Sequence, residues 1–293
     1  MKISATPLSV AREMKAAQLD QIKYFELLAS AGAEATDIVD PDPYSWFWKD
    51  YKKDIAALPG LLKANGLEIA AYATGNNFTL RDPEQFSRQI GHVKDAVRKT
   101  AELEVKILRI FGGYHKDINP EFDMDYAEGL KQIVRAIEEI LPCAEKNGVV
   151  LALENHGRLP GLAAELRYIM EYFNSPALGI CFDIANFTAH NMNEHEDAVA
   201  AYTMLKKYIK HVHCKDWQTA PAGSARPTVA AVCGKGCGIV PLRRLAYMME
   251  EDRFDGYWAL EYEAGGIEGF TESLRYMKSL QEAAALLYPE VKK

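Results

Sequence analysis

The most constraining feature of this 293-residue chain is a regular alternation of short apolar runs with longer amphipathic segments. Eight runs rich in Val, Ile, Leu and Ala have the length of buried strands. These runs are KISAT (2–6), AEATDIV (33–39), LEIAAYA (67–73), VKILRIF (105–111), VVLALE (149–154), LGICFD (178–183), IKHVHC (209–214) and GYWALEY (256–262). Between them lie helical patterns, for example over residues 11–32, 82–103 and 125–148. Strands that alternate with helices in this way predict a parallel sheet.

The side chains along the later strands favour a closed barrel over an open, doubly wound sheet. One parity is small or polar, as in Ala152 and Glu154, and the other is bulky, as in Leu151 and Leu153. Bulky side chains suit contact with outer helices, whereas small and polar ones suit a narrow barrel interior. The first strand is also not followed by the G-x-G-x-x-G motif of a dinucleotide-binding sheet. We therefore expect a single-domain α/β protein, a (β/α)8 TIM barrel over residues 1–293.

The composition excludes several classes of function. The formal net charge is −7 and no basic stripe is visible, which argues against a nucleic-acid-binding surface. No window approaches the ~18 apolar residues of a membrane-spanning helix, and the N-terminus lacks the apolar core of a signal peptide. The five cysteines are scattered, and Cys233 and Cys237 have no partner pair at zinc-site spacing. We expect a reduced, cytoplasmic protein without nucleic-acid or membrane partners.

Four consecutive strands in the second half end in a side chain that can bind a metal ion. They supply Glu154 in LALENH, Asp183 in GICFDIAN, His213 in HVHCKD and Glu261 in WALEYE. All four have the inward parity and lie at the mouth where (β/α)8 barrels carry their active sites. One such residue alone is often a helix cap or a salt-bridge partner, but three carboxylates gathered without a cation would repel one another. The pattern predicts a site for one divalent cation, Mg²⁺ or Mn²⁺ by its oxygen ligands, with the imidazole shifting the preference toward Mn²⁺, Co²⁺ or Zn²⁺.

Residues beside these ligands are candidates for substrate binding. His156 and Lys215 each follow a ligand by two residues and share its parity, so they point toward the space above the metal. Asn186 and Glu263 are rim residues, and Arg109 suits either substrate binding or a packing or salt-bridge role inside the barrel. His211 lies one layer deeper than the ligands, where a supporting or a core role is expected.

Two loops carry weaker candidates. The aromatic cluster Trp46, Phe47 and Trp48 follows the second strand, and it suits a sugar-stacking surface or burial against the next helix equally well. His115 follows the fourth strand and is a loop histidine.

At these motifs the sequence resembles the xylose isomerase-like TIM-barrel superfamily, often called sugar phosphate isomerases/epimerases. The matching segments are L-E-N-H with Glu154, F-D-x-x-N with Asp183, H-V-H-x-K-D with His213 and the last-strand L-E with Glu261. The resemblance implies that these four side chains bind one Mn²⁺, Mg²⁺, Co²⁺ or Zn²⁺ ion, and that Glu154 and Glu261 also act as acid and base. The cation would chelate adjacent carbonyl and hydroxyl oxygens and stabilise the enediolate that forms. A homo-oligomer, a dimer or tetramer, is also suggested by the resemblance alone.

The resemblance implies a divalent-metal-dependent isomerase or epimerase that acts on a small-molecule sugar or polyol. The pair Lys215–Asp216 departs from the ketose epimerases, which usually run into an arginine-containing segment here, and looks more like the inosose dehydratase and generic isomerase branches. A metal-dependent dehydratase or lyase acting on a keto-inositol or keto-glycoside is therefore the alternative. A nuclease of the endonuclease IV type is disfavoured because the chain is acidic and has only seven histidines. A non-catalytic sugar-binding protein is disfavoured because both glutamates are present.

Overall fold

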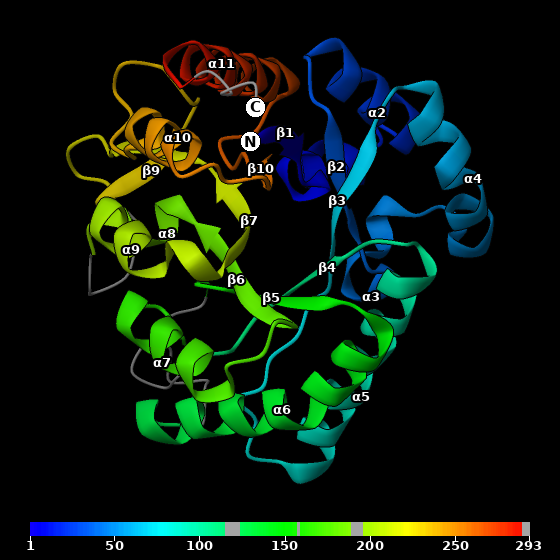
Figure 1. Ribbon diagram of the computed structural model, residues 1–293. Helices are drawn as coiled ribbons and strands as arrows, with labels where there is room; N and C mark the ends of the chain where they lie inside the picture. Colours follow the sequence, from blue (N-terminus) through cyan, green and yellow to red (C-terminus); the bar gives the residue numbers. More distant parts are fainter. Residues whose placement is uncertain (115–123, 157–158, 189–195, 289–293) are drawn as a thin grey trace, which may run out of the picture.

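Eight parallel strands close into a central barrel in the computed structural model, which describes residues 1–114, 124–156, 159–188 and 196–288 (Figure 1). Around the barrel the strand order is β1-β10-β7-β6-β5-β4-β3-β2. The barrel strands are β1 (Lys2–Ala5), β2 (Ala35–Val39), β3 (Glu68–Ala73), β4 (Ile107–Ile110), β5 (Val150–Glu154), β6 (Leu178–Asp183), β7 (Ile209–Cys214) and β10 (Tyr257–Leu260). Each lies within one of the eight predicted runs, so the predicted (β/α)8 barrel is confirmed.

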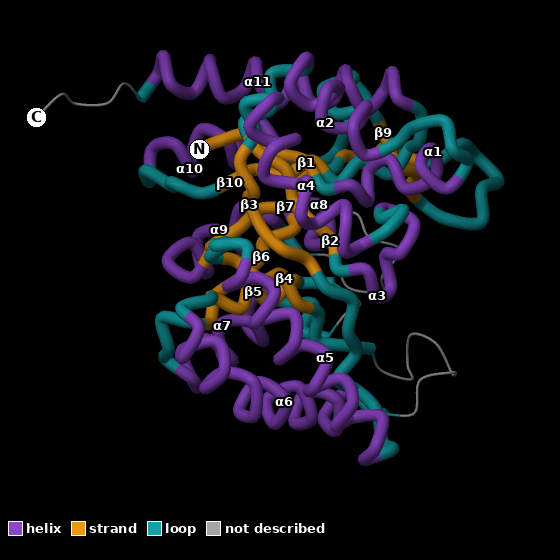
Figure 2. The backbone as a smooth tube through the Cα atoms, turned by 90° about the vertical axis from the view of Figure 1, so that its right-hand side faces the viewer, coloured by secondary structure: helices purple, strands orange, loops and turns teal. Residues whose placement is uncertain are grey.

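Helices surround the strands, and Figure 2 shows them on the outside of the strand core in a second view. The α-helices are α1 (Ala11–Lys15), α2 (Gln21–Ser30), α3 (Pro41–Tyr44), α4 (Tyr51–Ala64), α5 (Pro83–Glu102), α6 (Tyr126–Asn147), α7 (Ala163–Phe173), α8 (Ile184–Thr188), α9 (Ala198–Leu205), α10 (Leu242–Glu251) and α11 (Ile267–Leu287). The 3₁₀ helices are η1 (Pro7–Val10), η2 (Ser45–Phe47) and η3 (Lys206–Tyr208). Within the described ranges, none of the helices combines the length and the apolar character needed to cross a membrane.

The helices predicted at residues 82–103 and 125–148 are present as α5 and α6. Helix α6 begins with a capping box formed by Asp125 and Glu128 and ends at Gly148, whose φ of 66° is the left-handed conformation that glycine adopts without strain. The helix predicted over residues 11–32 is wrong as a single element. Helix α1 stops at Lys15, and Asp20 starts α2 anew by accepting a hydrogen bond from the backbone N–H of Lys23 at 2.9 Å.

Alternate side chains along the later strands are buried in two different parts of the interior, as the sequence predicts. Bulky side chains such as Leu151 and Phe182 belong to one hydrophobic core that also contains helix residues such as Leu166 and Ile169. Small residues of the other parity, such as Ala152, are buried but lie outside this core. The outer face of the barrel therefore packs against helices, and the inner face is left for the polar strand ends.

An antiparallel hairpin between β7 and α10 is not predicted from the sequence. It pairs β8 (Asp216–Thr219) with β9 (Thr228–Ala231), a separate two-stranded sheet. A carboxylate oxygen of Asp216 accepts hydrogen bonds from the backbone N–H groups of Trp217 at 2.9 Å and Val240 at 3.2 Å. Asp216 thus ties the start of the hairpin to the segment that leads into α10.

The aromatic cluster after β2 is largely a packing element. Phe47 and Trp48 are buried, and the indole N–H of Trp48 donates to the carbonyl oxygen of Val39 at 2.9 Å. Trp46 is half-buried. Burial is therefore the observed role for two of the three rings.

Candidate metal and substrate site

The four predicted ligands lie together at the carboxyl ends of the barrel strands. We call Glu154, Asp183, His213 and Glu261 the ligand cluster; one ligand atom from each lies within 4.8 Å of the others. Glu154 and Asp183 are the last residues of β5 and β6, His213 is the next to last of β7, and Glu261 directly follows β10. Parallel strands bring their carboxyl ends to one mouth of the barrel, so residues more than a hundred positions apart converge.

Several polar atoms in the ligand cluster are left without partners. Both carboxylate oxygens of Glu154 and the Nδ1 atom of His213 are buried and have no hydrogen bond among the described residues. Nδ1 of His213 lies 3.5 Å from a carboxylate oxygen of Glu154 and 3.8 Å from one of Glu261. Buried polar atoms are normally satisfied, because an unsatisfied one costs about 1–3 kcal/mol. Carboxylate oxygens and an imidazole nitrogen gathered within 4.8 Å of one another are a donor set that fits a divalent cation.

Lys215 lies closer to the ligand cluster than its sequence position suggested. Its ammonium group is within 2.9 Å of Asp183 and within 2.8 Å of both Glu261 and Glu263. Burial lowers the pKa of Lys215, but Asp183, Glu261 and Glu263 outweigh it and raise that pKa well above its usual range. Lys215 is therefore a buried ammonium group whose charged form is favoured by the carboxylates around it, two of which are ligands of the cluster.

Arg109 makes the salt bridge that was one of its two expected roles. Its Nε atom lies 3.4 Å from Glu154, and its Nη1 donates to the carbonyl oxygen of Thr74 at 3.0 Å. The guanidinium carbon lies 4.0 Å from the centre of the Phe111 ring, and the side chain is fully buried. Burial lowers the pKa of Arg109, but Tyr44 and Glu154 outweigh it and raise it.

His156 and Asn186 border the ligand cluster and keep free polar atoms. The imidazole of His156 packs against Phe111 with ring centres 4.5 Å apart, and its Nδ1 is buried without a hydrogen bond. Burial lowers the pKa of His156, which favours the neutral ring. The side-chain oxygen and nitrogen of Asn186 are also buried and without partners. His115 lies outside the described residues.

The acidic groups of the site have divergent pKa values in the absence of a cation. Burial raises the pKa of Glu154 and of Glu261, but His213 on the former and Lys215 on the latter outweigh it and lower both values. Burial raises the pKa of Asp183 to about 7 despite the attraction of Lys215. Burial lowers the pKa of His213, but Cys181, Glu154 and Glu261 raise it well above its usual range. The raised pKa values of Asp183 and His213 favour their protonated forms, so a cation that binds these two side chains must displace protons from them.

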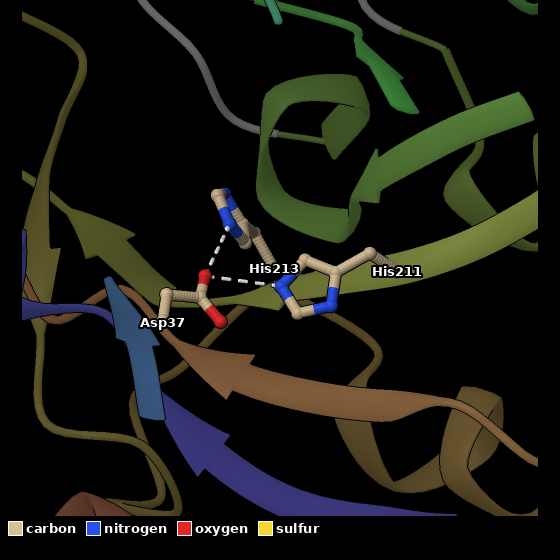
Figure 3. A group of neighbouring side chains, drawn as sticks. All are labelled: Asp37, His211 and His213. Carbon is tan, nitrogen blue, oxygen red and sulfur yellow. Dashed lines mark hydrogen bonds and ion pairs between the residues drawn. The ribbon is translucent and has the colours of Figure 1, made fainter. Parts of the chain in front are cut away.

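Asp37 is the residue that the sequence analysis missed. It lies inside β2, it is fully buried, and its carboxylate contacts both His211 and His213 (Figure 3). A signal was present, because Asp37 lies inside the run 33–39, between Thr36 and the apolar pair Ile38–Val39, whereas the other acidic residue of the run, Glu34, lies near its start. Its partners on β7 could not be identified without the closed barrel.

A closed (β/α)8 barrel with carboxylates and an imidazole gathered at its carboxyl mouth defines a class of barrels suited to metal-assisted chemistry. The profile of the xylose isomerase-like TIM barrel family matches residues 25–280, and the chain belongs to this family. A comparison with curated protein sequences found no match.

Solved structures share the fold at low sequence identity. A D-tagatose 3-epimerase-like protein is 19% identical, with a TM-score of 0.73 and 98% of this chain and 99% of that chain covered. The IOLI protein with a bound zinc atom is 18% identical, with a TM-score of 0.72 and coverage of 99% and 100%. The 3-keto-D-glucoside 4-epimerase YcjR from E. coli is 16% identical, with a TM-score of 0.71 and coverage of 95% and 99%.

Proposed function

We propose that the protein is a divalent-metal-dependent isomerase or epimerase that acts on a keto-sugar or a related polyol. The observation that carries this proposal is the ligand cluster, with its unpartnered oxygens of Glu154 and Nδ1 of His213. The chain belongs to the xylose isomerase-like TIM barrel family, and its fold is similar to that of a D-tagatose 3-epimerase-like protein and a 3-keto-D-glucoside 4-epimerase. Both findings support a carbohydrate substrate.

The charges around the ligand cluster support a divalent ion. Among the described residues, four carboxylates (Glu154, Asp183, Glu261 and Glu263) face two cationic side chains (Lys215 and Arg109). Asp37 adds a fifth carboxylate, against His213, so three negative charges remain when all of these groups are ionised, and one divalent cation would offset two of them. The three carboxylates and one imidazole suit Mn²⁺, Mg²⁺, Co²⁺ or Zn²⁺.

Glu154 and Glu261 are the proposed acid and base. When bound, the cation would polarise a substrate carbonyl and so lower the pKa of the adjacent C–H bond. The strands that carry the two glutamates, β5 and β10, are three positions apart around the barrel, so the carboxylates approach a substrate from different sides. One carboxylate would remove the proton next to the carbonyl and become protonated, and the other, protonated beforehand, would give its own proton to the opposite face. A proton given to the same carbon would invert its configuration, which is epimerisation. A proton given to the neighbouring carbon of the enediolate would move the carbonyl group, which is isomerisation.

The remaining predicted residues are proposed to bind substrate. His156 offers an unpartnered Nδ1, and Asn186 offers an amide with both polar atoms free, which suits hydroxyl groups. Lys215 would hold a substrate oxygen and fix the position of Glu261 through their 2.8 Å contact. Arg109 is already paired with Glu154, so we assign it the orientation of that carboxylate.

The test combines metal analysis with isotope exchange. We expect the wild type to contain one divalent ion per chain and to wash solvent deuterium into one substrate of a panel of ketoses, inososes and keto-glycosides. Glu154→Gln should weaken metal retention and abolish the exchange. A wild type that folds, binds no divalent ion and exchanges no substrate proton would contradict the proposal.

A dehydratase or lyase is the second candidate, because of His156. Its neutral imidazole, held near Glu154 by burial against Phe111, is a further base beside the ligand cluster. A β-elimination needs only one base for the C–H bond, and a second group can protonate the departing hydroxyl. Mass spectrometry of the product separates the two functions, since only elimination changes the mass.

A further inference from the structure

A buried group of three side chains lies directly beneath the ligand cluster. We call Asp37, His211 and His213 the Asp37 group; all three are fully buried. Nε2 of His211 lies 3.0 Å from Oδ2 of Asp37, and Nε2 of His213 lies 3.5 Å from the same oxygen. Figure 3 shows one oxygen of the carboxylate facing a nitrogen of each ring, with the aspartate from β2 and both histidines from β7. His213 therefore belongs both to this group and to the ligand cluster.

The two nitrogens of His213 face different partners. Nε2 faces Asp37, whereas Nδ1 faces the carboxylates of Glu154 and Glu261 at 3.5 and 3.8 Å. A neutral imidazole has one N–H group and one lone pair. Each ring nitrogen thus has a carboxylate 3.5 Å away, but a cation held by Glu154 and Glu261 would take the lone pair of Nδ1 and leave Asp37 to accept the hydrogen of Nε2. The lone pair then points to the place where a cation would be held.

Stability alone does not account for the Asp37 group. A buried carboxylate is costly unless it is paired and hydrogen-bonded, and apolar replacements are often as stable. The Oδ1 atom of Asp37, the Nδ1 atom of His211 and both ring nitrogens of His213 are buried without hydrogen bonds among the described residues, and Nε2 of His213 reaches Asp37 as a 3.5 Å ion-pair contact. The one oxygen of Asp37 that is engaged is the one that serves both histidines. The arrangement orients the rings and leaves other polar atoms unsatisfied.

We infer that Asp37 is a positioning residue for the metal site: with His211, it holds the ring of His213 so that Nδ1 faces the cation and Nε2 carries the hydrogen. This inference rests on the proposed function, since it requires that the ligand cluster binds a cation. His211 takes the supporting role, because its own Nε2 anchors the carboxylate at 3.0 Å.

The test measures Co²⁺ affinity through the visible absorption of the bound ion, starting from metal-free protein. Asp37→Asn keeps the size of the side chain and removes its charge. We expect its dissociation constant for Co²⁺ to rise by about 10–100-fold, the usual effect of removing such a support. The matched control is Thr36→Val on the same strand. Thr36 is equally buried, but its hydroxyl bonds Tyr24 and the backbone carbonyl oxygens of Ala5 and Asp37, and it contacts neither histidine through a hydrogen bond. The control should bind Co²⁺ as the wild type does.

The outcomes separate this inference from the proposed function. Equal Co²⁺ affinity in the wild type and Asp37→Asn would overturn the inference and leave the metal site standing. A wild type that binds no Co²⁺ would overturn both. Two equivalents in the wild type and one in Asp37→Asn would overturn the inference, because Asp37 would then be a ligand itself.

A second measurement needs no folded Asp37 variant. Nitrogen-15 NMR of histidine-labelled, Zn²⁺-loaded wild type reports which ring nitrogen carries the hydrogen. We expect hydrogen on Nε2 of His213 and metal on Nδ1, with the signals of His211 identified by their loss in His211→Gln. Hydrogen on Nδ1 of His213 would overturn the inference.

Discussion

The ammonium group of Lys215 shows how far a single residue's role depends on its surroundings. In the sequence it is a lysine two positions after a proposed ligand, but in the fold it contacts Asp183, Glu261 and Glu263 at 2.8–2.9 Å. Buried charges that face each other in this way depend strongly on both partners. Lys215 therefore neutralises part of the acidic mouth in the metal-free protein.

Lys215→Met should destabilise the metal-free protein by about 3–5 kcal/mol, because it leaves buried carboxylates without their counter-charge. Saturating Mn²⁺ should recover part of the loss. Urea unfolding with and without Mn²⁺ measures both effects. The matched control is Lys235→Met, which removes an exposed lysine paired with Glu272 at 2.9 Å and should leave the unfolding midpoint unchanged. Equal effects of the two substitutions would contradict the role given to Lys215.

The pKa shifts of the ligand cluster predict a link between pH and metal binding. Asp183 in the folded, metal-free protein has a pKa raised to about 7, against about 3.9 in an unfolded chain. Between these values the folded state holds a proton that the unfolded state has lost, so this contribution to stability falls as pH rises. The raised pKa of His213 has the same effect at higher pH: the folded state keeps a proton that the unfolded state has lost, so stability falls as pH rises.

A divalent cation needs the deprotonated ligands, so its effect runs the other way. We expect the rise in melting temperature caused by saturating Mn²⁺ to be larger at about pH 8 than at about pH 5.5. Thermal unfolding at both pH values, with Mn²⁺ and with a chelator, measures this difference. A rise that is equal at the two pH values, or larger at the acidic one, is the contrary result.

At the scale of elements, the carboxylate of Asp216 joins the start of the β8–β9 hairpin to the segment that leads into α10. Burial raises the pKa of Asp216, but its side chain still accepts backbone hydrogen bonds from Trp217 and Val240. The segment before α10 passes close to this carboxylate, and a methyl group added at Gly238 would lie 2.0 Å from one of its oxygens. Glycine is required there for close approach rather than for an unusual φ.

Gly238→Ala should therefore destabilise the protein by about 1–3 kcal/mol, the usual cost of forcing extra atoms into a packed position. Gly236→Ala is a close control, since a methyl group there meets nothing within 4 Å. Denaturant unfolding measures the stability, and limited proteolysis reports whether the hairpin segment loosens. If Gly236→Ala costs as much as Gly238→Ala, the close approach to Asp216 is not the cause.

On the scale of the whole molecule, closure of the barrel pairs its first strand in the sequence with its last. Strand β1 pairs with β10 in parallel, with Ile3 opposite Trp258 and Ala5 opposite Leu260. Trp258 is 1% exposed and lies in the core, and its indole N–H contacts the sulfur of Met249 at 3.1 Å. A large side chain at this closing pair stabilises the first and the last barrel strands together.

Trp258→Ala should lower the free energy of unfolding by about 3–5 kcal/mol, through lost burial and the cavity left behind. Leu286→Ala, at a side chain that is 84% exposed near the end of α11, should have little effect. Chemical denaturation followed by circular dichroism compares the two. A small effect of Trp258→Ala would mean that the neighbouring strands and helices collapse into the space.

The order of strands and helices was predictable from the sequence, because strands and amphipathic helices follow from periodicities within 5–20 residues. Glu154, Asp183, His213 and Glu261 could be proposed for the same reason: each ends an apolar run, and parallel strands bring such ends together. Cap signals near helix ends were equally local, although the break between α1 and α2 at Asp20 was missed.

Only the tertiary structure decided the contacts that cross the barrel. Asp37 and His211 lie 174 positions apart in the sequence, and nothing local to β2 points to β7. The pairing of Arg109 with Glu154, the three carboxylates around Lys215 and the hairpin after β7 are likewise products of barrel closure. The sequence alone determined which side chains reach the mouth of the barrel. The closed barrel determined which of them touch, because side-chain contacts depend on distances that no sequence spacing encodes.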